Sequence, residues 1–148
     1  MAAFARFLVV RLSGREFAIP AGRICGMLQM RGLEVQPMSG LGSLRYLTAM
    51  HGRALPIFVP NEDLGLKVQP VSARTCLVLL NTSTREAALD ASRADCAMAV
   101  DSISRLEDLP ASHCRLPHQV RIGDKWRDVL DVDRLCRPRA FVDNSRIA

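Results

Sequence analysis

The residue best suited to acid or base chemistry in this chain is His51, in the stretch YLTAMHGRALPIFVP at residues 46–60. An imidazole ordinarily titrates near neutral pH and can act as a general base. Such a role also needs a nucleophile and a group that orients the imidazole, and the sequence has no nucleophile elbow and no glycine-rich phosphate loop. We therefore predict that His51 is a turn or surface residue and that the protein is not an enzyme.

Cysteine and histidine side chains raise the separate possibility of a metal site. His113, Cys114 and His118 lie close together in sequence and Cys136 follows, but two adjacent ligands and a third four residues later are not a usual zinc spacing. The five cysteines are odd in number, include no C-x-x-C pair and mostly have apolar neighbours. We predict buried, reduced thiols, with no metal and no cofactor.

The carboxylates of Asp131 and Asp133 could form an acid–base pair or bind a metal. A short helix predicted at residues 132–137 gives them a simpler role, because Asp131 precedes its first turn and Asp133 lies within it. We expect Asp131 to cap the helix and Asp133 to interact with its electropositive end. Asp101 is similarly predicted to be a turn residue at the end of a strand.

Composition and charge restrict the function further. The chain has 148 residues, 49% of them apolar and 24% charged, as is typical of a folded globular domain. Its net charge of +5 comes mainly from arginines spread along the sequence, and only 5% of residues are aromatic. Nucleic-acid surfaces usually cluster cations and interleave aromatics. We therefore expect no nucleic-acid partner, and keep a basic small-barrel nucleic-acid-binding module only as the alternative function.

Localisation is predicted from the absence of targeting signals. The apolar runs are far shorter than a membrane-spanning helix needs. The N-terminal stretch MAAFARFLVVRL carries charges within its apolar residues and is not followed by a typical cleavage site. We predict a cytoplasmic protein that does not insert into the membrane.

The elements expected to position these residues are short strands. Residues 6–20 have the pattern of a hairpin with a turn at Gly14, and His51 and Gly52 are predicted to form the turn of a second hairpin. Further elements are predicted as strands at 23–30, 75–81 and 96–100, a hairpin around Gly123 and Asp124, and one helical turn at 61–64.

Many strands at short intervals, with little helix, predict an all-β protein built from small antiparallel barrels. Composition places the division between two groups of strands near residues 67–74. A unit of about 60 residues buries only about 60% of the surface that its unfolded chain exposes, and is therefore marginally stable alone. We expect two fused barrels that share a core.

The order and spacing of several blocks, FLVVRLSGREFAIP, LTAMHGRALPIF, CLVLL, AVDSI and VLDVDRL, resembles the CheW-like domain family over residues 4–136. The resemblance implies a single domain over residues 1–148, made of two intertwined five-stranded SH3-like barrels with short helices. The implied parts are a first subdomain at about 14–66, a second at about 74–136 joined by the strand at 6–12, and a C-terminal tail at 137–148.

The resemblance also implies a function. Proteins of this family have no known catalytic activity and couple transmembrane chemoreceptors to the histidine kinase CheA. For this chain it implies a chemotaxis-type signal transduction adaptor associated with membrane receptor arrays. The implied partners are the regulatory domain of a CheA-type kinase, which docks on one barrel end, and the cytoplasmic tip of a methyl-accepting chemoreceptor, which lies in a groove between the barrels.

Three positions depart from the family pattern. The family typically has Gly-x-x-x-x-Arg-Gly before its proline-containing strand, where this chain has Tyr46 and His51 in place of the glycine and the arginine. The glutamate that pairs with the family's arginine corresponds here to Gly26. Losing both partners of an ion pair can be nearly neutral for stability, whereas losing one is costly. We therefore predict a folded protein with an altered groove.

The altered groove indicates that the protein serves a specialised receptor array. The predicted output of that array is pili, surface sensing or development rather than swimming. The residues predicted to line the groove are Ile24, Gly26, Met27, Tyr46, Met50 and His51. Ile24, Met27 and Met50 are equally well interpreted as core residues, because apolar residues in strands are usually buried.

Overall fold

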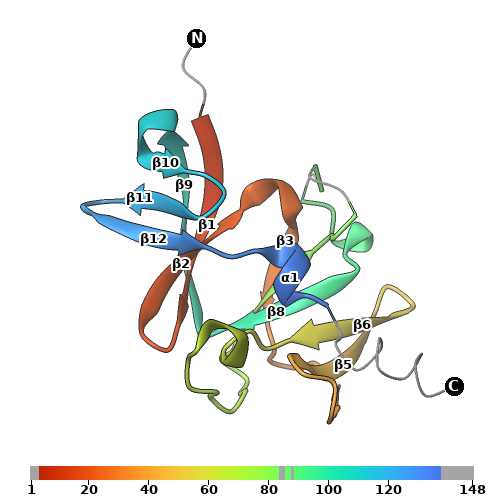
Figure 1. The fold of residues 1–148 in the computed structure, drawn as a ribbon. Coiled ribbons are helices and arrows are strands. Elements are labelled where there is room, and N and C mark those ends of the chain that lie inside the picture. The colour runs from red at the N-terminus through yellow and green to blue at the C-terminus, as the bar shows by residue number, and fades with distance from the viewer. Residues whose placement is uncertain (1–3, 84–85, 88, 138–148) are drawn as a thin grey trace, which may run out of the picture.

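The computed structural model describes residues 4–83, 86–87 and 89–137, and this part of the chain forms two six-stranded sheets (Figure 1). The first sheet contains β1 (Phe4–Leu12), β2 (Arg15–Pro20), β9 (Ser102–Pro110), β10 (Cys114–Arg115), β11 (Gln119–Ile122) and β12 (Lys125–Val129). The second sheet contains β3 (Ile24–Gln29), β4 (Val35–Pro37), β5 (Leu44–Met50), β6 (Arg53–Phe58), β7 (Cys76–Leu80) and β8 (Cys96–Val100). The helical elements are η1 (Ala21–Arg23), η2 (Glu62–Leu64), η3 (Ala91–Arg93), η4 (Ala111–His113) and α1 (Val132–Leu135).

The predicted all-β class and the predicted hairpins are confirmed. β1 and β2 pair antiparallel across Ser13 and Gly14, whose φ angles are 50° and 77°. β5 and β6 pair across His51 and Gly52, with φ angles of 52° and 73°. Two successive residues of positive φ are what a two-residue hairpin turn requires. His51 is therefore a turn residue, as the sequence predicts.

Strand pairing divides the chain differently from the sequence-based boundary at 67–74. The first sheet has the order β10-β11-β12-β2-β1-β9 and the second β3-β7-β8-β6-β5-β4. The chain therefore changes sheet twice, between β2 and β3 and between β8 and β9, and the segment 67–74 connects two parts of the second sheet. Each sheet also contains one parallel pair, β2 with β12 and β6 with β8. The short strands β4 and β10 bring each sheet to six strands where five were predicted.

The largest hydrophobic cluster lies between the two sheets, which confirms the prediction of a shared core. It contains Phe17 and Leu8 from the first sheet and Phe58 and Met98 from the second, all at most 2% exposed. Two smaller clusters fill the individual barrels: one contains Leu55, Leu77 and Ala97 of the second sheet, and the other Phe7, Val9 and Val120 of the first. Neither sheet has a complete core without the other.

α1, the one α-helical segment in the part of the chain that the structure describes, packs against this shared core. α1 buries Val132 and Leu135, and the Ser43 hydroxyl donates a hydrogen bond of 3.1 Å to the carbonyl oxygen of Leu135. The carboxylate of Asp131 accepts a hydrogen bond of 3.2 Å from the backbone N–H of Arg134, so Asp131 caps the helix as predicted. α1 spans 132–135, and the tail from residue 138 lies outside the described residues.

Candidate functional site

The β5–β6 turn presents His51 at a small surface hollow of about 130 Å³, called here the His51 pocket. Its lining is formed by Met50, His51, Arg53, Ala54, Leu55, Ala91, Ala94 and Asp95. The Arg53 guanidinium donates hydrogen bonds of 2.6 and 3.0 Å to the carbonyl oxygens of Ser92 and Ala94. These bonds fasten the hairpin that carries His51 to η3 and the residue after it.

The carboxylates beside this pocket are engaged in local hydrogen bonds. Asp90 accepts bonds from the Ser92 hydroxyl at 2.6 Å and from the Ser92 N–H at 3.1 Å. These bonds are the main reason that the pKa of Asp90 lies below its usual range, and the nearby His51 adds a smaller lowering. Asp95 accepts a bond of 2.8 Å from the Thr82 hydroxyl. Both carboxylates therefore hold the loops around the pocket.

The structure brings together part of the predicted groove. Met50 and His51 line the His51 pocket. Gly26 lies behind its wall, because a Cβ at this position would be 3.7 Å from the Cβ of Ala91. Tyr46 and Met50 are both half-buried and pack against the core of the second barrel.

Ile24 and Met27 lie elsewhere. Ile24 is 1% exposed and belongs to the core shared by the sheets, so the groove prediction is corrected for this residue. A bulge between Ile24 and Gly26 shifts the register so that Gly26 stands opposite Leu79, and Met27 opposite Val78. Successive side chains of a strand point to opposite faces. Gly26 meets Leu79 on one face of β3. Met27, which is 40% exposed, therefore projects from the opposite face.

Replacing Gly26 tests whether this position needs a glycine. We expect Gly26→Ala to leave the free energy of unfolding unchanged or to raise it by up to about 1 kcal/mol, because alanine restricts the unfolded chain. The added Cβ would make ordinary contacts, the nearest at 3.5 Å from Cδ1 of Leu79. Urea unfolding measures the difference. The matched control is Gly52→Ala, which should destabilise because Gly52 has φ of +73°; equal losses in both variants would contradict the expectation.

A larger hollow lies beside the crossing from the first sheet to the second. This junction groove has a volume of about 560 Å³ and is formed by the start of β1, the end of β2, η1, residues 116–118 and residues 129–133. It was missed by sequence reasoning, because its walls come from four separate segments of the chain and none carries a motif.

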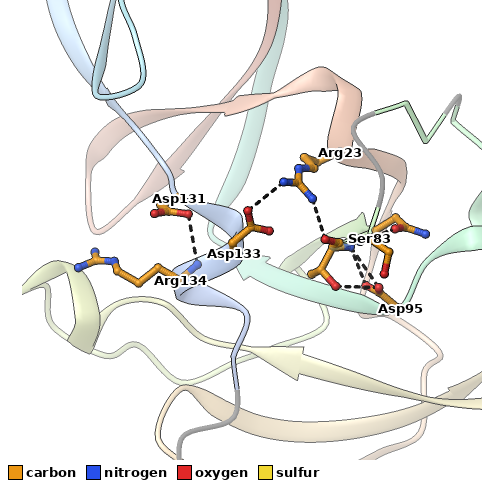
Figure 2. A network of polar contacts seen from close by, with 8 residues as sticks. Arg23, Ser83, Asp95, Asp131, Asp133 and Arg134 are labelled. Carbon is orange, nitrogen blue, oxygen red and sulfur yellow. Dashed lines mark hydrogen bonds and ion pairs between the residues drawn. The ribbon is translucent and has the colours of Figure 1, made fainter.

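A polar network connects the junction groove with the His51 pocket (Figure 2). The Arg23 guanidinium, 13% exposed, lies 2.9 Å from a carboxylate oxygen of Asp133 and donates a bond of 2.8 Å to the carbonyl oxygen of Thr82. Thr82 in turn donates to Asp95 from its hydroxyl and its N–H. Since Arg23 and Asp133 line the groove and Asp95 lines the pocket, the two hollows share one set of hydrogen bonds.

The thiols differ in part from the prediction. Cys25 and Cys96 are buried, whereas Cys76, Cys114 and Cys136 are half-buried, and all five are free thiols. Burial is the main cause of a raised pKa for Cys25 and for Cys114. A hydrogen bond with Cys136, together with burial, raises the pKa of Cys96. Among the residues that the structure describes, no group of three His, Cys, Asp or Glu side chains could hold a metal ion.

Two sheets around a shared core, with a pocket at one turn and a groove at their junction, define a double-barrel β domain. A family model described as CheW-like domain matches residues 6–134, so the chain belongs to the CheW-like domain family, whose members are non-catalytic scaffolds and adaptors of chemotaxis signalling.

The solved structures include a similar fold. The crystal structure of scaffolding protein TtCheW from Thermoanaerobacter tengcongensis superimposes with a TM-score of 0.70 at 8% sequence identity, covering 90% of this chain and 92% of that one. Comparison with curated proteins gives no match. Within the described ranges, no helix has both the length and the apolar character needed to span a membrane.

Proposed function

We propose that this chain is a coupling adaptor that joins the cytoplasmic tip of a methyl-accepting chemoreceptor to the regulatory domain of a CheA-type histidine kinase. The observation that carries the proposal is the family match over residues 6–134, which includes strands of both barrels. In this role the protein catalyses no reaction and works at membrane receptor arrays by presenting binding surfaces.

The receptor-facing surface is proposed to be the face around the His51 pocket. Gly26, Tyr46, Met50 and His51 lie on or against this part of the second barrel. The pocket has apolar walls from Met50, Leu55 and alanines, with polar groups at its margin. Protein interfaces commonly combine an apolar centre with a polar rim. Met27 is exposed on the opposite face of β3 from this pocket. That it contacts the receptor stays a prediction.

The departures at Gly26, Tyr46 and His51 support a specialised array over a swimming array. The family's glutamate and arginine are both replaced here, by Gly26 and His51. Neither the glutamate nor the arginine is therefore left without its partner. His51 adopts a φ of 52° in the turn, and Tyr46 is only half-buried. A receptor tip selected for the charged pair would find a glycine and a histidine at these two positions. Pili, surface sensing or development are the proposed outputs.

Titration calorimetry with the kinase regulatory domain and with two receptor tips tests this function. We expect saturable binding of the kinase domain, and weaker binding of the cell's major receptor tip than of the tip of a receptor from a specialised array. His51→Asn should weaken receptor binding alone, because asparagine tolerates the positive φ of the turn but lacks the imidazole.

The double variant Gly26→Glu with His51→Arg restores the family's charged pair. It should gain affinity for the major receptor tip by about tenfold, corresponding to about 1.4 kcal/mol. Kinase-domain binding serves as the control, because it should be the same in all variants. Tight binding of the major tip by the unmodified protein would refute the specialisation, and failure to bind the kinase domain would refute the adaptor function.

A further inference from the structure

Two cysteine thiols meet at the core that the sheets share. Cys96 is the first residue of β8 in the second sheet and is 3% exposed. Cys136 follows α1 and packs, half-buried, against the same hydrophobic cluster. The two thiols are hydrogen-bonded to each other. Residues 97–135 separate them along the chain, so the fold brings them into contact.

Packing holds the helix end that carries Cys136. α1 buries Val132 and Leu135 in the shared cluster, and the N–H of Cys136 donates a bond of 2.9 Å to the carbonyl oxygen of Val132. The Ser43 hydroxyl donates a bond of 3.1 Å to the carbonyl oxygen of Leu135. Thiols held in hydrogen-bond contact need only a small approach to reach the geometry of a disulfide.

Polar contacts also tie α1 to the segment that carries Cys96 (Figure 2). Asp133 of α1 lies 2.9 Å from the Arg23 guanidinium, which donates a bond of 2.8 Å to the carbonyl oxygen of Thr82. The Thr82 hydroxyl donates a bond of 2.8 Å to Asp95, the residue before Cys96. The distance between the two cysteine-bearing elements is therefore set by apolar packing and by polar contacts together.

The other three cysteines have different surroundings. The thiols of Cys76 and Cys114 donate to backbone carbonyl oxygens at 3.8 and 3.5 Å. Cys25 is 1% exposed within the core of the second barrel. Within the ranges that the structure describes, Cys96 and Cys136 are therefore the pair of cysteines placed in mutual contact.

The two thiols of this pair differ in their access to solvent. Cys136 is half-buried at the end of a helix, where a small oxidant can reach it, whereas Cys96 is 3% exposed. The hydrogen bond with Cys136 and burial both raise the pKa of Cys96, which keeps it in the thiol form. Redox-sensing cysteines are accessible and often lie next to a second cysteine that resolves the oxidised one. Cys136 is therefore the thiol expected to react first.

We propose that Cys96 and Cys136 are a redox modification site, which hydrogen peroxide converts reversibly into a disulfide that locks α1 onto β8. The Cys136 sulfur attacks one peroxide oxygen, the O–O bond breaks, and the Cys136 proton leaves with the other oxygen as water. The Cys96 sulfur then attacks the sulfur of the sulfenic acid so formed. The S–S bond forms, the S–O bond breaks, and the hydroxyl leaves with the Cys96 proton as a second water.

The bond would join the two sheets covalently. β12 of the first sheet leads into α1, whereas β8 belongs to the second sheet. The two thiols lose two electrons in forming it, the peroxide is reduced to water, and a dithiol reductant reverses the reaction. The cross-link restricts the unfolded chain over residues 97–135, so the oxidised protein should unfold at a higher temperature. This proposal does not rest on the proposed adaptor function.

Peptide mass spectrometry of the whole chain tests the site. The fully reduced protein is treated with hydrogen peroxide, its free thiols are alkylated, and it is digested without reductant. We expect a disulfide-linked pair of peptides containing Cys96 and Cys136, which dithiothreitol separates. Cys114→Ser is the matched control, because it removes a half-buried thiol outside the pair and should leave the linked peptides unchanged.

Two variants separate the steps of the reaction. Cys96→Ala leaves Cys136 without a resolving thiol, so its sulfenic acid should accumulate and be trapped by dimedone. If Cys96→Ala folds poorly, Cys136→Ser at the half-buried position tests the same pair, and peroxide should then produce no linked peptide and no thermal shift. In the unmodified chain, oxidation should raise the midpoint of thermal unfolding by about 10 °C, as measured by circular dichroism.

Three results would overturn the proposal. The first is the absence of the Cys96–Cys136 peptide pair after treatment with peroxide. The second is an equal yield of pairs that involve the other cysteines, which would show that the contact in the fold does not direct the reaction. The third is an oxidised chain that contains the bond but unfolds at the same temperature as the reduced chain, which would show that no lock forms.

Discussion

Phe17→Ala is expected to lower the free energy of unfolding by about 4 kcal/mol, which is typical for truncation of a buried phenylalanine. Phe17 lies in β2 of the first sheet, is 2% exposed and belongs to the core that both sheets share. Because that core contains Phe58 and Met98 of the second sheet, the loss should be felt by both sheets together.

Urea unfolding followed by two signals measures this effect. Trp126, the only tryptophan, lies in β12 and reports on the first sheet, while far-ultraviolet circular dichroism reports on both. The two transitions should coincide in the unmodified chain and shift together in Phe17→Ala, as for a two-state domain. Phe4→Ala is the matched control, since Phe4 is 62% exposed and its loss should cost no more than about 0.5 kcal/mol. Separate transitions would show that the barrels fold independently.

Glu16→Gln is expected to cost about 2 kcal/mol, between the values typical of exposed and of buried ion pairs, because the pair with Arg127 is half-buried. The Glu16 side chain is 12% exposed and lies 3.0 Å from the Arg127 guanidinium and 3.8 Å from that of Arg105. Arg11, on the neighbouring strand, is also 3.8 Å away. Without the carboxylate, three guanidinium groups from three strands would face one another. The Nε of Arg127 is already buried without a hydrogen-bond partner in the described residues.

The control for this variant is Glu107→Gln. Glu107 pairs with Arg105 at a more exposed position, where an ion pair contributes no more than about 1 kcal/mol. Combining Glu16→Gln with Arg127→Met should restore part of the lost stability, because the half-buried charge nearest to the lost carboxylate is removed. Chemical denaturation compares the four proteins. A loss in Glu16→Gln no greater than that in Glu107→Gln would show that the cluster around Glu16 does not stabilise the first sheet.

The sequence by itself determined the local elements. The hairpins at residues 6–20 and around His51 were predictable because turn residues of positive φ and alternating apolar residues act over a few positions. The helix cap at Asp131 followed from the same kind of local rule. The placement of His51 in a turn, and so the argument against catalysis by this residue, also needed only neighbouring residues.

Only the tertiary structure decided which strands share a sheet and where the hollows lie. β7 and β8 pair with β3 and β6 of the second sheet, and no local pattern selects these distant partners. One bulge between Ile24 and Gly26 separates these two residues, so that Ile24 belongs to the core shared by the sheets and Gly26 lies against Leu79 of the second barrel. The junction groove needs four separate segments to meet, so it depends on how the whole chain packs and not on the properties of any single stretch.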